Sequence, residues 1–125
     1  MNLRTLSLVA LALGTSTIVF AADDDNPIKK AMQLVHKAPK GEKKISEKIV
    51  AGTATDDEVK ATLDAYKAIG DTKPPKGDAA GFKDKMVKLI AATEDVAAHK
   101  AGAPEAYKEA SNCKACHSEH KEDKK

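Results

Sequence analysis

The longest helical pattern in this 125-residue chain is the segment DAAGFKDKMVKLIAATEDVAAHKAG, which covers residues 78–102. Asp78 is a suitable N-cap, and Gly102 marks the end of the pattern. Apolar residues recur at helical spacing on one side of the segment, and lysines and carboxylates occupy the other side. The segment therefore predicts the longest helix of the fold, with one face turned toward a core.

Proline, glycine and capping residues divide the remainder of the chain into further helical segments. Asn26-Pro27 predicts the start of a first helix, which the turn residues 39–41 interrupt, and a short amphipathic segment follows at 45–50. Thr55 opens a capping box for a helix that ends at Gly70, and a polar connector occupies residues 71–77. Pro104 suits the first turn of a last helix, on which five residues are expected to share one face: Ala106, Ala110, Cys113, His117 and His120.

The composition also favours helices over sheets. Aromatic residues make up only 3% of the chain, Ala and Lys dominate, and the part after the first twenty residues has no β-branched runs. Four main helices with short connections predict an all-α fold, namely an antiparallel four-helix bundle in residues 22–125.

The first 21 residues have the pattern of a cleaved secretory signal peptide. Arg4 supplies a positive charge, residues 6–20 are mostly apolar, and residues 19–21 resemble the site that a signal peptidase reads. The alternative is a membrane anchor, but residues 14–17 interrupt the apolar run, which falls short of the ~20 residues that a spanning helix needs. We therefore expect cleavage after Ala21 or Ala22, export to the periplasm, and a mature domain without a membrane span.

The charge balance gives no indication of a nucleic-acid partner. The formal net charge is +2, and loss of Arg4 would leave 20 Lys against 19 acidic residues and no Arg. Such a chain lacks the basic stripe that is typical of nucleic-acid binding. Lys108, Lys114 and Lys121 could steer an acidic redox partner, although lysines spread over every helix are more often solvated. The identity of a redox partner stays open.

Residues 113–117, CKACH, match the CxxCH sequence that attaches haem c. Cys113 and Cys116 are one helical turn apart, so that both thiols can add to vinyl groups on the same edge of one porphyrin. His117 is placed one turn after Cys113 to bind the iron as the proximal ligand. A haem would also supply a large apolar body to a chain with few aromatic side chains. The motif therefore predicts one covalent haem c.

Other uses of a CxxC pair fit the chain less well. A surface disulfide between Cys113 and Cys116 is compatible with an oxidising compartment, but a thioredoxin-like redox pair needs a βαβ context that this chain lacks. A zinc site needs a second pair of ligands besides His120. His120 is one turn beyond His117 and could flank the haem edge or face solvent.

The sixth position of the iron has three alternatives. Met32 lies on the expected inner stripe of the first helix, and a Met/His pair is typical of electron-transfer cytochromes, although Met also fills core space readily. His36, one turn later, is an alternative ligand, or an exposed histidine beside Lys37. The position could also be empty. Met86 is expected in the core, and His99 in solvent.

The chain resembles the class II c-type cytochromes, the cytochrome c′-like four-helix bundles that carry CxxCH near the C-terminus. The likeness is best over residues 77–121, where DAAGFK opens the long helix and NCKACH precedes the basic Lys121. Family members with a Met on the first helix are low-spin electron carriers, whereas an apolar residue there leaves the iron five-coordinate and open to small gases. Met32 looks like the Met of the first kind. Members are often homodimers through the first helix, which Pro39 and Gly41 interrupt here, so the oligomeric state stays open.

These observations predict an exported, monohaem c-type cytochrome that carries single electrons and is not an enzyme. A second hypothesis is a five-coordinate protein that binds nitric oxide or carbon monoxide, with Met32 off the iron. A third is peroxidase-like turnover, which needs an open iron and a distal acid–base residue, for which His36 is the candidate.

Overall fold

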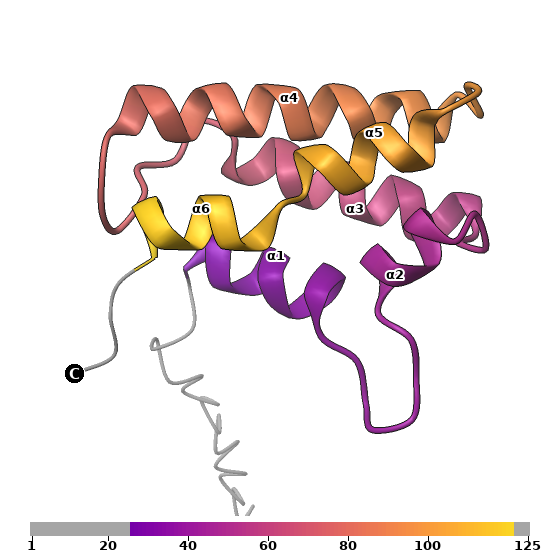
Figure 1. Ribbon diagram of the computed structural model, residues 1–125. Coiled ribbons are helices and arrows are strands. Elements are labelled where there is room, and N and C mark those ends of the chain that lie inside the picture. Colours follow the sequence, from indigo (N-terminus) through magenta and orange to yellow (C-terminus); the bar gives the residue numbers. More distant parts are fainter. Residues whose placement is uncertain (1–25, 122–125) are drawn as a thin grey trace, which may run out of the picture.

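The computed structural model describes residues 26–121, which form six α-helices (Figure 1). They are α1 (Pro27–His36), α2 (Ile45–Val50), α3 (Asp56–Ile69), α4 (Ala79–Ala97), α5 (Ala103–Ala110) and α6 (Cys113–His120). Residues 26–121 contain no strand, so the all-α prediction is confirmed. The expected signal segment, residues 1–21, and its cleavage site lie outside the described residues. None of the described helices combines the length and the apolar character that crossing a membrane requires.

Three helices begin where the sequence predicted because their caps act locally. The side chain of Asn26 accepts a hydrogen bond from the backbone of Ile28 at 3.0 Å and starts α1. Thr55 and Glu58 form the reciprocal capping box of α3. Asp78 accepts hydrogen bonds from the first backbone amides of α4. Each cap satisfies donors that the helix itself cannot use, which fixes the start of the helix independently of tertiary contacts.

The long helices pack in sequence order around one core. Helix α3 contacts α1 on one side and α4 on the other, and α5 packs along α4 (Figure 1). Helix α2 contacts α1, α3 and α5, while α6 packs on α4. The most deeply buried large side chains are Tyr66, Tyr107, Ile49, Ile69 and Val35. The core cluster also includes Phe82, Met86 and Leu89 of α4, so that helices α1 to α5 all contribute to it.

Helix α4 ends earlier than the sequence predicted, because a Schellman motif terminates it. The backbone amide of Lys100 donates to the carbonyl of Asp95 at 3.0 Å, and that of His99 donates to the carbonyl of Val96 at 3.0 Å. His99 occupies the left-handed position of this motif, with φ 55°. The expected terminator, Gly102, instead precedes α5 as its N-cap, with φ 76°.

The expectation of one continuous last helix is wrong. Ser111 ends α5, and the side chain of Asn112 accepts a hydrogen bond from the backbone of Ala115 at 3.1 Å to start α6. Short polar side chains compete with the helix for backbone hydrogen bonds, which is why this dipeptide breaks the helix. Helix α6 consequently leaves the line of α5 (Figure 1). The expected shared face is therefore absent: His117 is exposed, whereas His120 is buried.

Candidate functional site

The two thiols lie in the first turn of α6. Both cysteines are free; Cys113 is exposed and Cys116 is half-buried. Burial raises the pKa of Cys116 above its ordinary value, and the positive charge of Lys85 offsets part of that effect. Helix α6 thus presents two unpaired thiols one turn apart, which is the spacing on which the haem prediction depends.

The C-terminal residues of α6 fix this helix against α4 and against the connector that precedes α4. Lys85 and Glu119 form an ion pair at 2.5 Å. The ring of His120 is buried, lies edge-on against Phe82 with centroids 5.4 Å apart, and has Nδ1 3.1 Å from the carbonyl oxygen of Lys76. Because a carbonyl can only accept, Nδ1 carries the hydrogen, and Nε2 has no hydrogen-bond partner within residues 26–121. His120 therefore docks the helix and does not face solvent.

A glycine makes this docking possible, and its replacement is expected to disturb it. Gly77 has φ 83°, and a Cβ there would overlap the carbonyl oxygen of Glu119 and lie 2.9 Å from Nδ1 of His120. Gly77→Ala should lower the free energy of unfolding by about 2–3 kcal/mol, through backbone strain and overlap together. Gly41→Ala is the matched control, because Gly41 has φ 93° but no atom within 4 Å of the added Cβ. Denaturant unfolding measures both variants, and equal losses would contradict the docking role of Gly77.

Cys113 borders an open pocket of about 310 Å³ whose exposed lining is mainly apolar. Residues of α1, α2, α5 and α6 line it: His36, Ser46, Glu47, Val50, Ala51, Lys108, Ser111 and Cys113. Cys116 borders a different pocket of about 170 Å³, together with Met86 and Leu89 of α4. Sites for organic cofactors are concave and mostly apolar, and the exposed surface beside each thiol has these two features. Within residues 26–121, no cluster of three or more His, Cys, Asp or Glu side chains could hold a metal ion unaided.

His36 is held by a buried hydrogen-bonded pair of tyrosines. Its Nε2 lies 3.0 Å from the hydroxyl of Tyr66, and that hydroxyl lies 2.8 Å from the hydroxyl of Tyr107. Both tyrosines are fully buried, and the rings of His36 and Tyr66 stack with centroids 6.3 Å apart. The alternative of an exposed His36 is therefore wrong. The chain of hydrogen bonds joins α1, α3 and α5, and His36 at its end lines the pocket at Cys113.

The same burial shifts the acid–base behaviour of all three groups. Burial lowers the pKa of His36, and the positive charges of His117 and Lys44 lower it further. Burial also raises the pKa of Tyr66 far above its ordinary value, and raises the pKa of Tyr107 to about 12. Near neutral pH, His36 is therefore a neutral imidazole and both tyrosines keep their hydroxyl hydrogens.

Alkaline titration should reveal this pair, because Tyr66 and Tyr107 are the two tyrosines of the chain. Their raised folded-state pKa values mean that the unfolded chain loses protons first, from pH about 10 upward. The stability contributed by the pair is therefore complete below pH 10 and falls as the pH rises through the folded-state values. Tyrosinate absorbance should appear together with the loss of helical circular dichroism. Tyrosinate formation near pH 10 with full helicity would contradict the buried pair.

Met32 and Met86 occupy the environments that the sequence predicted. Met32 is partly buried beside Ile28 and packs against the core, which confirms its place on the inner stripe of α1. It does not line the pocket beside Cys113. Met86 is 4% exposed and belongs to the core cluster of α4, as expected.

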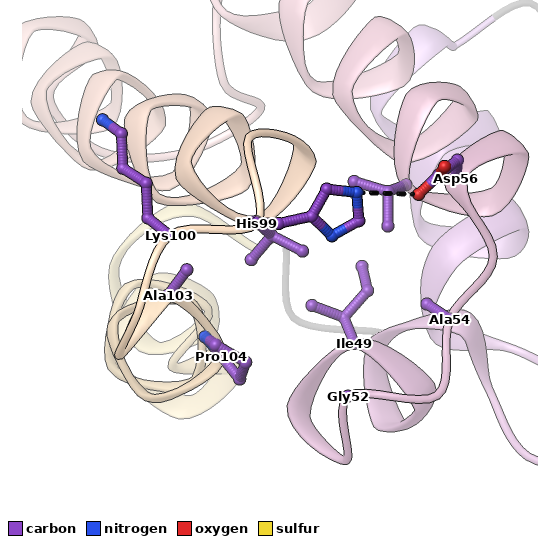
Figure 2. Close-up of a pocket in the computed structure, with 10 residues that line it drawn as sticks. Ile49, Gly52, Ala54, Asp56, His99, Lys100, Ala103 and Pro104 are labelled. Carbon is purple, nitrogen blue, oxygen red and sulfur yellow. Dashed lines mark ion pairs between the residues drawn. The ribbon is translucent and has the colours of Figure 1, made fainter.

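Another pocket, of about 220 Å³, lies at the junction of α2, α3, α4 and α5 (Figure 2). His99 extends across it toward α3, where its Nε2 lies 3.2 Å from a carboxylate oxygen of Asp56. Both side chains are largely exposed, which agrees with the expectation for His99. No residue that lines this pocket belongs to α6.

Sequence reasoning missed the tyrosine pair at the site. Tyr66 and Tyr107 are 41 residues apart, and their contact depends on the packing of α3 against α5. One chemical signal for the pair was available in the sequence. A buried tyrosine hydroxyl needs a hydrogen-bond partner, and the second of the two tyrosines is one of the few candidates in this chain.

No family model, curated protein or solved structure matches this chain.

Proposed function

We propose that this chain is an exported, monohaem c-type cytochrome that carries single electrons. The observation that supports this proposal most directly is the pair of free thiols, Cys113 and Cys116, one turn apart at the start of α6 and followed by His117. Each thiol borders a concave surface, and the surface at Cys113 is mainly apolar. Covalent attachment of a haem requires such a pair of reduced cysteines with an adjacent histidine.

Each residue of the site then has a defined task. Cys113 and Cys116 would hold the haem as thioethers, His117 would be the proximal ligand, and Met32 the distal ligand. The bound haem supplies a reversible one-electron couple whose potential depends on its axial ligands and on burial. The ion pair of Lys85 with Glu119 and the docking of His120 would keep α6, and with it both thioethers, in a fixed position.

We also propose that the described helices are the parts of an antiparallel four-helix bundle. The main elements would be α1, α3, α4 and the α5–α6 unit, joined by short connections. The contacts of α3 with α1 and α4, and of α4 with α5, support this arrangement. The break between α5 and α6 would let the haem-bearing helix border the pocket that residues of α1, α2 and α5 also line.

Denaturing mass spectrometry tests the proposal. The full chain should be exported from a host that matures c-type cytochromes and purified without added cofactor. We expect one haem mass per chain that persists through denaturation, together with loss of residues 1–21 or 1–22. A chain of unmodified mass, or one that is lighter by two hydrogens because of a disulfide, would overturn the proposal.

A five-coordinate, gas-binding cytochrome is the second candidate. The observation that favours it is that Met32 packs against the core and does not line the pocket beside Cys113. If Met32 stays there when haem is bound, the iron is open and takes carbon monoxide or nitric oxide. Peroxidase-like turnover receives less support, because the hydrogen bond to Tyr66 engages Nε2 of the acid–base candidate, His36.

A further inference from the structure

The direction of the hydrogen bonds between Tyr107, Tyr66 and His36 follows from counting donors. Tyr66 is the one hydrogen-bond partner that residues 26–121 give to the hydroxyl of Tyr107. If Tyr107 donates to Tyr66 and Tyr66 donates to Nε2 of His36, both hydroxyl hydrogens have acceptors. In the reverse direction, the hydrogen of Tyr107 has no acceptor although its side chain is fully buried. Because an unsatisfied buried donor is costly, the first direction is the stable one.

This direction fixes the state of His36. Its Nε2 is the acceptor of the bond from Tyr66, so Nε2 is unprotonated and Nδ1 carries the hydrogen. An unprotonated imidazole nitrogen is the atom that binds iron. Here the hydroxyl of Tyr66 occupies that atom at 3.0 Å, and the two rings lie beside each other with an angle of 29° between their planes.

His36 also lies close to the helix that would hold the haem. It lines the same pocket as Cys113. Without the bond to Tyr66, the chain would therefore offer the iron a competing nitrogen ligand from α1.

We propose that the Tyr107–Tyr66 pair holds His36 off the haem iron and so reserves the sixth position for Met32, an inference that rests on the proposed function. Tyr66 is a positioning residue that acts through His36. Its hydroxyl decides between a Met/His haem and a bis-His haem. These two forms differ in potential, since a thioether ligand raises the potential.

Tyr66→Phe in the haem-loaded protein tests the proposal. The variant should lose the Met-to-iron charge-transfer band of the oxidised protein, and its midpoint potential should fall, because the released Nε2 of His36 binds the iron. The double variant Tyr66→Phe/His36→Ala should recover the band and the potential. Tyr107→Phe is the matched control, because it removes a buried hydroxyl but keeps the bond from Tyr66 to His36, so its spectrum should be that of the wild type.

Each of the following spectral results would overturn the proposal. The first is a wild-type band and potential in Tyr66→Phe. The second is a changed spectrum that persists in the double variant, which would show a packing effect. The third is the loss of a nitrogen ligand of the iron when His36→Ala is compared with the wild type, which would show that His36 already binds the iron. If the wild-type iron is high-spin, Tyr66→Phe must turn it low-spin, and an unchanged high-spin spectrum would equally contradict the proposal.

A nitrogen-15 measurement separates this inference from the proposed function. Imidazole shifts of the ¹⁵N-labelled protein report which ring nitrogen of His36 carries the hydrogen. We expect hydrogen on Nδ1 and an unprotonated, iron-free Nε2 in the wild type, and an iron-bound Nε2 in haem-loaded Tyr66→Phe. Absence of haem would overturn the proposed function, whereas hydrogen on Nε2 of His36 in the wild type would overturn the inference alone.

Discussion

Replacing Cys113 and Cys116 together with serine is expected to leave the purified protein without covalent haem. Serine keeps the size and the helix position of each cysteine but cannot form a thioether. The loss should therefore be complete in denaturing mass spectrometry and in the absorbance of the denatured protein. Each single replacement should leave one thioether and hence a haem that is still bound covalently but has an altered spectrum.

The matched control is Ser118→Ala on the same helix. Ser118 is exposed, and its hydroxyl donates to the carbonyl of Ala115 at 3.1 Å without touching either thiol. This variant should retain a full complement of haem. Covalent haem in the double cysteine variant, or its loss in Ser118→Ala, would contradict the assignment of Cys113 and Cys116.

Replacing Met32 with alanine is expected to convert the iron from low-spin to high-spin. The thioether would be lost from the sixth position, so the ferrous protein should bind carbon monoxide readily and the Met-to-iron charge-transfer band should disappear. Since Met32 is only partly buried, the free energy of unfolding should fall by about 1–2 kcal/mol, less than for a fully buried methionine. Optical spectra with and without carbon monoxide measure the first effect, and denaturant unfolding measures the second.

Met86→Ala separates ligation from packing. Met86 is 4% exposed in the core, so its truncation should cost about 2–5 kcal/mol of stability but leave the iron low-spin. A Met32→Ala variant that loses stability and keeps the wild-type spectrum would show that Met32 only fills space. The five-coordinate, gas-binding reading would then require that the wild type already binds carbon monoxide.

The parts of the fold that local chemistry determines were predictable from the sequence. Asn26, Thr55 and Asp78 satisfy backbone donors within three residues, so the starts of α1, α3 and α4 could be located without knowledge of their neighbours. The inner positions of Met32 and Met86 also followed, because helical periodicity assigns residues to faces.

The predictions that were wrong concern helix ends with a competing local structure and side chains whose position depends on tertiary contacts. The Schellman motif at His99 and the cap at Asn112 each end or start a helix where the helix could also have continued. The two alternatives differ by a small free energy, and hydrophobic periodicity does not distinguish them. The burial of His120 depends on the connector at Gly77, and the bond of His36 to Tyr66 depends on the packing of α1 against α3. These contacts join residues that are 30 or more positions apart in the sequence. Helical periodicity describes only residues on the same helix, so it does not predict such contacts.

The optical spectrum of the purified, exported protein tests most directly the central claim, that the chain is an electron-carrying c-type cytochrome. The spectrum is recorded for the oxidised protein, for the reduced protein, and for the reduced protein under carbon monoxide. An electron-carrying cytochrome with Met32 on the iron predicts a low-spin spectrum, a Met-to-iron charge-transfer band, and no response to the gas. A high-spin spectrum that shifts under carbon monoxide would contradict the Met32 assignment and favour gas binding. No haem absorbance, from a host that matures c-type cytochromes, would contradict both functions.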